Sequence, residues 1–293
     1  MDAMTDSTRA ELTAQRARQA LRGSGLSQRQ VAANIGIDET KLSKSLSGRR
    51  RFAAEELLGL ATATGATVRW LLGDESEVSV TPANLRPESR QRAGASLDSS
   101  PRRLIVETAW DLFARHGYDT VRIADIAEAA GVSSASIHYH FDGKSELFDA
   151  TLDYSVKLAF DRQIAWLDAV RSPRSRLQRL LELQSPIGRT TRSEWSIWLQ
   201  TWSRLALEDP HASDYPANYD RWSQTVRSTI EAGQAEGAFR RGDSGAMADE
   251  LTSLLDGLGV KVLTGIMDAA TFRRRLSNYL KRAIFTPNPD EES

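Results

Sequence analysis

A short pattern of apolar and small residues occurs twice in this chain, 95 residues apart. The first copy covers 31–37 and reads VAANIGI, and the second covers 126–132 and reads IAEAAGV. Apolar positions lie on both sides of a glycine, Gly36 or Gly131, which accepts the positive backbone angle of a tight turn. The pattern predicts two short helices joined by a turn in each copy, which is a helix-turn-helix.

Polar residues mark where these short helices begin. Ser27 with Gln30 fits a capping box ahead of the first motif. Asp38 and Ser133 stand where the second helix of each pair needs a cap. A helix-turn-helix places its second helix in the major groove of DNA, so two motifs in the same register predict a DNA-binding regulator.

The rest of the chain reads as helical segments around these motifs, so the expected fold class is all-α. Pro82, Pro87 and several serines interrupt any helical period and predict a linker, and Ser100-Pro101 is typical of a new helix start. The expected division is a helical domain at 1–75, a linker at 76–100, a three-helix domain at 101–150, a larger helical domain at 151–286 and a disordered tail at 287–293.

Composition narrows the class of protein. The 293 residues suffice for two domains, and the absence of cysteine excludes disulfides and thiolate metal sites. No apolar run is long enough to span a membrane, and the N-terminus does not resemble a signal peptide. No phosphate loop, nucleophile elbow or paired carboxylates appear, so we expect no enzyme and no cofactor. The expected location is the cytoplasm, in association with the nucleoid.

Charge is unevenly distributed, although the net charge is only −1. Between residues 16 and 51 nine bases face two acids. Phosphate attraction is screened over roughly 10 Å, so this basic stretch can act on DNA in a nearly neutral chain. Acids offset the five bases between Arg102 and Lys144, so the second motif must use helix N-termini and neutral donors.

Residues 10–74 resemble the DNA-binding domain of the phage-repressor (Cro/C1, or XRE) family. The resemblance implies that the helix at 38–47 enters the major groove, that Gln28 anchors to phosphate and that base readers lie on this helix. The arginines that follow the helix are expected to contact phosphate. The DNA contacts expected from the first motif are Gln28, Glu39, Thr40, Ser43, Lys44, Arg49, Arg50 and Arg51.

The segment TVRIADIAEAAGVS at 120–133, with IHYHF at 137–141, closely resembles the TetR family of bacterial one-component regulators. The resemblance is tight over 102–150 and looser to about 285. It implies DNA contacts at Thr120, Arg122, Ser134, Ala135, Ser136, His138, Tyr139, His140 and Lys144. His138 and His140 point to different sides of a helix with no acid cluster beside them, so we expect DNA contact and no metal. Many relatives carry a basic residue in place of Ser134 or Asp142.

In that family the domain after the second motif binds a ligand and dimerises. Five of the seven tryptophans lie there, which favours an apolar pocket for a small apolar or aromatic effector over an ordinary core. The expected pocket residues are Trp166, Trp195, Trp198, Trp202, Tyr219 and Trp222. The last two helices match the pair that forms a four-helix interface. The expected homodimer residues are Leu251, Leu254, Leu255, Leu258, Val262, Phe272, Leu276, Tyr279 and Leu280.

The resulting hypothesis is a dimeric, ligand-responsive repressor that binds double-stranded operator DNA through two different helix-turn-helix domains per protomer. An alternative hypothesis is that the N-terminal domain serves protein–protein interaction or dimer stabilisation and does not read DNA. Activation in place of repression stays open, as do the operator sequence and the identity of the effector.

Overall fold

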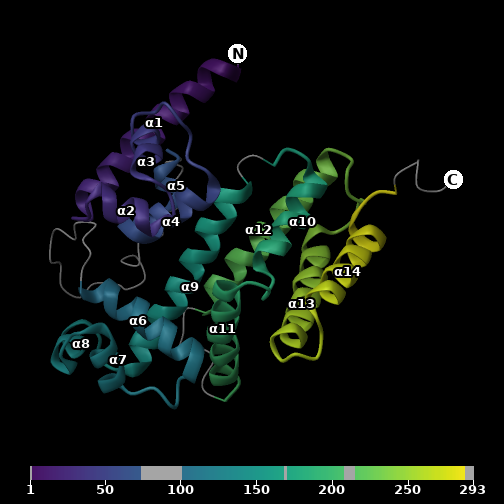
Figure 1. Ribbon diagram of the computed structural model, residues 1–293. Helices are drawn as coiled ribbons and strands as arrows, with labels where there is room; N and C mark the ends of the chain where they lie inside the picture. The colour runs from purple at the N-terminus through teal and green to yellow at the C-terminus, as the bar shows by residue number, and fades with distance from the viewer. Residues whose placement is uncertain (1, 74–100, 168–169, 208–214, 288–293) are drawn as a thin grey trace.

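The computed structural model describes residues 2–73, 101–167, 170–207 and 215–287 (Figure 1). Within these ranges the chain consists of helices and turns, with one isolated bridge between Phe239 and Phe285. The all-α prediction is confirmed. The predicted linker at 76–100 and all of the predicted tail except Pro287 lie outside the described residues.

Five helices form the N-terminal domain: α1 (Asp2–Gly23), α2 (Gln28–Asn34), α3 (Glu39–Leu46), α4 (Ala54–Thr64) and α5 (Val68–Leu71). The predicted caps are present, because Ser27 and Gln30 form a reciprocal capping box and Asp38 accepts from the amide of Lys41 at 2.7 Å. Gly36 has a φ of +71°, as the tight turn between α2 and α3 requires. Buried apolar residues of α2 and α3 pack against buried apolar residues of α1 and α4.

An ion pair holds the loop between α3 and α4. The Arg50 guanidinium donates to both carboxylate oxygens of Glu56, at 2.7 and 2.6 Å, and to the Ser45 hydroxyl at 2.8 Å. Glu56 also accepts from the backbone amide of Ala53 at 2.9 Å, which starts α4. These donors, Arg50 foremost, hold the pKa of Glu56 below its usual value.

The second motif comprises α6 (Pro101–His116), α7 (Ile123–Ala130) and α8 (Ser134–His140). Gly131 has a φ of +66° between α7 and α8, and Ser133 accepts from the amide of Ser136 at 3.1 Å, as predicted. The core beneath the motif contains Phe113 and Ile137.

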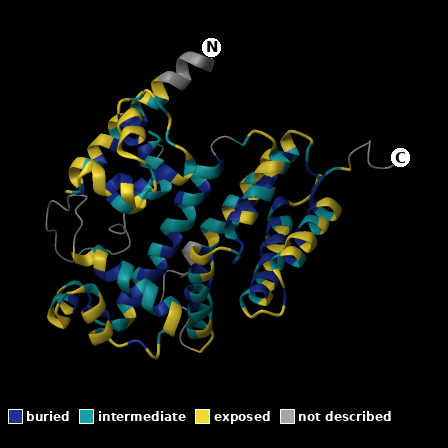
Figure 2. Ribbon diagram, viewed as in Figure 1, coloured by how far each residue is buried: buried dark blue, intermediate teal, exposed yellow. Residues whose placement is uncertain are grey.

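The remaining helices are α9 (Lys144–Leu167), α10 (Pro173–Gln184), α11 (Arg189–Leu207), α12 (Tyr215–Ala235), α13 (Ser244–Leu263), α14 (Ala269–Tyr279) and a π-helical segment, Leu280–Ile284. Figure 1 shows α13 and α14 side by side at the side of the molecule away from the N-terminal domain. α9 is the common support of the structure. It packs against α4, α5, α6, α10 and α11, and no residue from 150 to 167 is exposed (Figure 2).

The N-terminal domain is docked on α9. The Asp161 carboxylate of α9 accepts from the backbone amide of Val68 at 2.8 Å, and both residues are buried. Ile164 and Ala165 of α9 pack against the core of the N-terminal domain. Arg103 of α6 donates to the carbonyl oxygens of residues 62 and 63, both at 3.2 Å, where α4 ends.

We expect Glu56→Ala to raise the rate of local opening of the N-terminal domain. The variant leaves the Arg50 guanidinium and the Ala53 amide without their acceptor, a loss of about 2 kcal/mol for hydrogen bonds to a charged group. Hydrogen exchange of peptides from 28–64 measures this opening free energy. Glu55→Ala is the control, because Glu55 is an exposed acid in the same helical turn. Equal exchange in the two variants would contradict the structural role of the pair.

Candidate DNA-binding surfaces and ligand pocket

The outer face of α8 gathers the residues predicted for the second motif. Ser134, Ala135, His138 and Tyr139 are exposed, and Tyr139 has a relative exposure of 74%. Ser136 and His140 are half-buried, and Thr120 and Arg122 are exposed beside α7. A large aromatic side chain that water surrounds in the free protein has area to offer to a partner. The face suits contact with a nucleic acid.

Lys144 stands at the start of α9, below this face. Its ammonium group lies 4.4 Å from the ring centre of Tyr118 and donates to the carbonyl oxygen of Asp119 at 3.4 Å. Arg204 of α11 lies over the same ring, also at 4.4 Å, and donates to the Ser145 hydroxyl at 3.0 Å. The two cations therefore tie the second motif to the larger helical domain.

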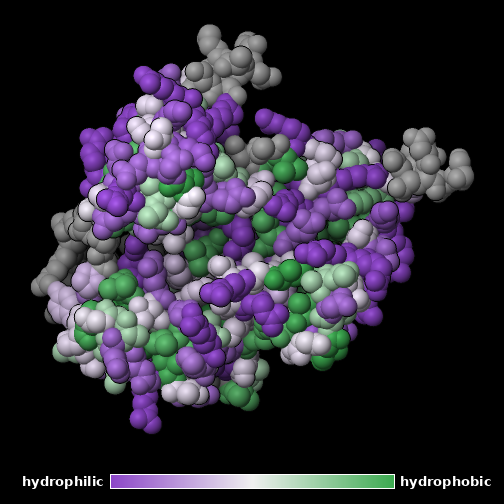
Figure 3. All heavy atoms as spheres, in the orientation of Figure 1, coloured by the Kyte–Doolittle hydropathy of each residue, from purple (hydrophilic) through white to green (hydrophobic). Residues whose placement is uncertain are grey.

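The first motif presents a similar face on α3. Glu39, Thr40, Ser43 and Lys44 are exposed, whereas the other side of the helix is buried. Gln28 is exposed at the start of α2, and Arg49 and Arg51 are exposed after α3. In Figure 3 hydrophilic residues dominate the visible surface of the N-terminal domain.

The basic stretch of the first motif is less available to DNA than its sequence indicates. Arg50 is engaged by Glu56 and Ser45, so a phosphate would have to compete with these partners for the predicted contact. Arg18 donates to the carbonyl oxygen of Leu46 at the end of α3, and Arg16 donates to that of Trp70 at 2.7 Å. Three of the nine bases thus hold the domain together.

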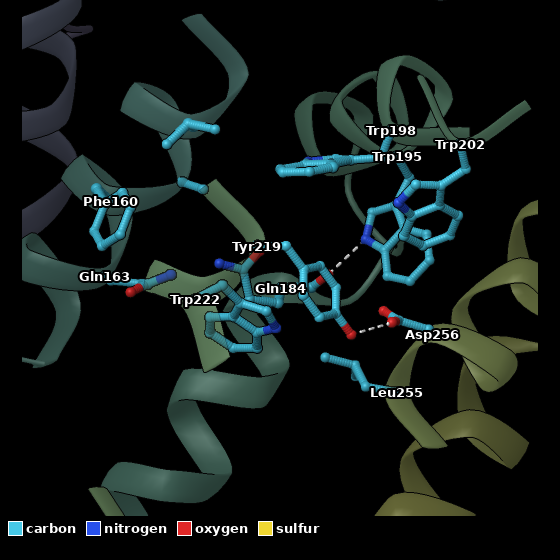
Figure 4. A pocket seen from close by; sticks show the side chains of 12 residues that line it. Phe160, Gln163, Gln184, Trp195, Trp198, Trp202, Tyr219, Trp222, Leu255 and Asp256 are labelled. Atoms are coloured by element: carbon cyan, nitrogen blue, oxygen red, sulfur yellow. Dashed lines mark hydrogen bonds between the residues drawn. The ribbon is translucent and has the colours of Figure 1, made fainter. Parts of the chain in front are cut away.

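An aromatic cavity of about 60 Å³ lies between α9, α10, α11, α12 and α13 (Figure 4). Its lining comprises Val156, Ala159, Phe160, Gln163, Gln184, Trp195, Trp198, Trp202, Tyr219, Trp222, Leu255 and Asp256. The cavity is several times larger than the roughly 10–15 Å³ that a single water needs.

Three tryptophans from successive turns of α11 form one side of the cavity. The rings of Trp195 and Trp202 meet edge to face, with centroids 6.3 Å apart. Trp195 donates its indole N–H to the carbonyl oxygen of Gln184 at 2.7 Å, which fixes the ring plane. Gly259 of α13 lies directly behind this ring, and a Cβ at that position would collide with it. The glycine therefore sets how far Trp195 can recede from the cavity.

Asp256 faces this aromatic wall and, among the described residues that line the cavity, is the only one with a formal charge at neutral pH. Its carboxylate accepts from the Tyr219 hydroxyl at 2.9 Å, as Figure 4 shows. Burial raises the pKa of Asp256 to about 6, although the Tyr219 hydrogen bond opposes the shift. Burial, followed by the nearby Asp256 charge, raises the pKa of Tyr219 to about 12. Aromatic faces and one carboxylate together attract a cation.

A second buried carboxylate near the cavity is already paired. Glu194 of α11 accepts from both terminal nitrogens of Arg162 on α9, at 2.9 and 2.6 Å. Arg162 also donates to the carbonyl oxygen of Leu183 at 3.0 Å, which links α9, α10 and α11. Burial raises the pKa of Glu194, and Arg162 opposes that shift. Asp256 therefore remains the carboxylate that a ligand can meet.

Five of the six predicted pocket residues line the cavity, and Trp166 does not. Trp166 lies under the guanidinium of Arg179, 4.4 Å from its ring centre, and packs against the larger core. Asp256 also lines the cavity and was not among the predicted pocket residues. Its signal was a single carboxylate inside the apolar run from Leu254 to Leu258.

The predicted dimer residues mostly lie inside the protomer. Leu254 and Tyr279 are half-buried, whereas seven are buried in the core that α13 and α14 share with the helices behind them: Leu251, Leu255, Leu258, Val262, Phe272, Leu276 and Leu280. The apolar stripe that suggested an interface is the inner face of these two helices. A partner would meet other side chains of the pair.

Two family models match the chain. Residues 105–151 match the bacterial regulatory proteins of the tetR family, and 173–284 match the C-terminal domain of BetI-type transcriptional repressors. The chain is 30% identical over 99 residues to the regulator TtgW of Pseudomonas putida, of which it covers 74%. The chain belongs to the TetR family. Neither model includes the N-terminal domain.

Other relatives agree with this membership over shorter stretches. The chain is 30% identical to SrpR of Pseudomonas putida over 99 residues and 39% identical to the negative regulator IcaR of Staphylococcus aureus over 57 residues. Those matches cover 29% and 20% of this chain, and it spans only 46% and 28% of the two relatives. The described residues contain no helix that is long and apolar enough to cross a membrane.

Solved structures support the TetR fold. A transcriptional regulator from Saccharomonospora viridis, solved in complex with choline, is 45% identical with a TM-score of 0.60. The match covers 64% of this chain and 98% of that one. A TetR-family regulator from Rhodococcus shares the fold at 24% identity and a TM-score of 0.54, with 61% of this chain and 96% of that one covered.

Gly259→Ala is expected to displace Trp195 and change the near-ultraviolet circular dichroism of this TetR-family protein. Forcing a methyl group into a packed site costs about 1–3 kcal/mol. Gly257→Ala is the matched control, because a Cβ there meets nothing within 4 Å on the same helix. Both variants gain the same helix propensity, so an unchanged spectrum in Gly259→Ala would refute the positioning role of Gly259.

Proposed function

We propose that this chain is a ligand-responsive dimeric repressor whose effector is a small quaternary ammonium compound such as choline. The observation that carries the proposal is the aromatic cavity with Asp256 facing the tryptophans of α11. A quaternary ammonium group offers no hydrogen-bond donor, so ring faces and a carboxylate are its natural partners. The choline complex of the 45% identical regulator supports the same class. The expected apolar effector is thereby refined to an apolar cation.

The proposed action on DNA follows from the position of α9. Its first turn carries Lys144 beside the second motif, and its later turns line the cavity. Ligand binding favours one of two arrangements of α9 and the DNA-binding helices. In the liganded arrangement the two recognition helices of a dimer no longer match the spacing of both half-sites, and operator affinity falls. Binding to an operator would place the protein on chromosomal DNA in the cytoplasm.

The proposed dimer uses the outer sides of α13 and α14. Leu254 and Tyr279 belong to the predicted set and remain accessible, and Ile266 in the turn between the helices is 77% exposed. Tyr279 donates to Glu250 at 3.0 Å on this side. The seven buried leucine, valine and phenylalanine side chains would then support the interface from behind.

We further propose that the N-terminal domain is a second DNA-reading unit. Its support is the capped helix pair and the exposed polar face of α3, with Arg49 and Arg51 next to it. The alternative role, interaction with a protein or stabilisation of the dimer, would use the same face. The two roles differ in whether charge on that face changes DNA affinity or assembly.

Choline affinity is expected to fall by about tenfold or more in Asp256→Asn, which keeps the shape of the side chain and removes its charge. Titration with choline chloride, followed by tryptophan fluorescence, measures it. The raised pKa of about 6 means that protons compete with the cation below that pH. Affinity should therefore rise with pH by up to about tenfold per unit below 6 and level off above 7.

The neutral carbon isostere of choline, dimethylbutanol, is the control ligand, and its affinity should not vary with pH in this range. Asp256→Asn should likewise show a flat profile. Equal affinity for both compounds, or a pH profile that Asp256→Asn retains, would contradict the role of this carboxylate. Saturating choline should also release the protein from its operator, which gel retardation measures.

For the N-terminal domain we expect Lys44→Glu with Arg49→Glu to weaken operator binding by at least about tenfold and to lower the salt slope by about two. The control pair is Arg241→Glu with Lys281→Glu, two exposed bases far from both motifs with the same change in net charge. Light scattering reports the assembly state. Unchanged DNA affinity with an altered mass would favour the protein-interaction role.

A further inference from the structure

The middle of α9 contacts the cavity with one face and the N-terminal domain with another. Its inner face, at Val156, Ala159, Phe160 and Gln163, lines the cavity. The spacing of these four positions is that of one side of a helix. The adjacent face carries Asp161, Ile164 and Ala165, which contact the N-terminal domain. One residue step therefore separates the cavity wall at Phe160 from the docking carboxylate.

The Asp161 carboxylate restricts movement of the N-terminal domain relative to α9. One Asp161 oxygen accepts from the Val68 amide at 2.8 Å, and the other accepts from Lys157 at 2.7 Å. Asp161 is 4% exposed and Val68 is fully buried. Separating the Val68 amide from Asp161 would leave a buried backbone donor without an acceptor, and the buried carboxylate would lose one of its two partners, which is costly. The N-terminal domain therefore has to follow this turn of α9.

A second connection runs through α6, the first helix of the TetR-type motif. Arg103 donates to the last carbonyl groups of α4, where a cation also meets the negative end of the helix dipole. Trp110 of the same helix donates to the Ser155 hydroxyl of α9 at 2.7 Å. The N-terminal domain, α6 and α9 therefore each contact the other two, and α9 carries part of the cavity lining.

From these contacts we propose that the N-terminal domain is controlled by the same effector as the TetR-type motif, through the docking of α4 and α5 on α9. The inference rests on the proposed function of the cavity. A ligand that displaces Phe160 or Gln163 acts on the helical turn that holds Val68. Because coupling between two sites is reciprocal, engagement of the N-terminal domain must also change effector affinity.

Hydrogen exchange of the full chain tests this coupling with two disturbances of the cavity. One is saturating choline chloride, and the other is Gly259→Ala, which moves Trp195 without any ligand, with Gly257→Ala as its control. Each disturbance should change exchange in peptides from 54–73, which hold α4 and α5, by about fivefold or more. Peptides from 28–46 of the same domain provide the internal reference.

Asp161→Ala should abolish the response of 54–73 to both disturbances while 189–207 still responds. Lys157→Gln is its control, because it removes the ion pair and retains the bond from Val68, and the response should persist. If 189–207 responds and 54–73 does not, the coupling is wrong. If choline changes no peptide while Gly259→Ala changes 54–73, the coupling stands and the quaternary ammonium assignment is wrong.

Discussion

A helix with no exposed residue over five turns imposes a strict condition on its sequence. From 150 to 167 every residue of α9 is buried or half-buried, so the fully buried polar groups among them need internal partners. Thr151 donates to the carbonyl oxygen of Phe148, Ser155 accepts from Trp110, and Asp161 accepts from Val68 and Lys157. The bond from Trp110 joins α9 to α6, and the bond from Val68 joins α9 to the N-terminal domain. The polar residues of the helix are thus the points where the domains are fastened.

The cavity beside this helix contains a half-buried carboxylate that no described cation neutralises. Six of its twelve lining residues are aromatic, and the carboxylate of Asp256 is held among them with the Tyr219 hydroxyl as its hydrogen-bond donor. Burial penalises the charged form, and the elevated pKa expresses that penalty. A cation placed between the aromatic rings and Asp256 would offset this penalty on the charged carboxylate. Glu194 differs because its carboxylate already has a cationic partner in Arg162, although burial still raises its pKa.

Local rules predicted the helical motifs well. Gly36, Gly131 and the caps at Ser27, Asp38 and Ser133 depend on a few neighbouring residues, so the sequence contains all the information that fixes them. The ion pair of Arg50 was not predicted, because a run of arginines does not reveal which one faces an acid six residues away. Trp166 does not line the cavity, and the sequence could not show this because helical spacing places a residue on a face without saying what covers that face.

Contacts between segments that lie far apart in the chain could not be predicted from the sequence. The apolar stripe of α13 and α14 indicated a buried face and could not distinguish a partner subunit from the core of the same chain. The docking on α9 depends on residues 93 positions apart, Val68 and Asp161, and neither belongs to a recognisable motif. A helix buried on all sides lacks the single apolar stripe from which its neighbours could be inferred.

The docked domain also limits what deletion can reveal about it. A shortened protein that began near residue 100 would open Ile164, Ala165 and the Asp161 carboxylate to water, and Arg103 would lose the carbonyl groups that it caps. Its DNA and ligand affinities would then reflect the exposed support helix together with the missing N-terminal domain. Substitutions on the exposed side of α3 leave that support intact, so they isolate the contribution of the N-terminal domain where truncation would confound it.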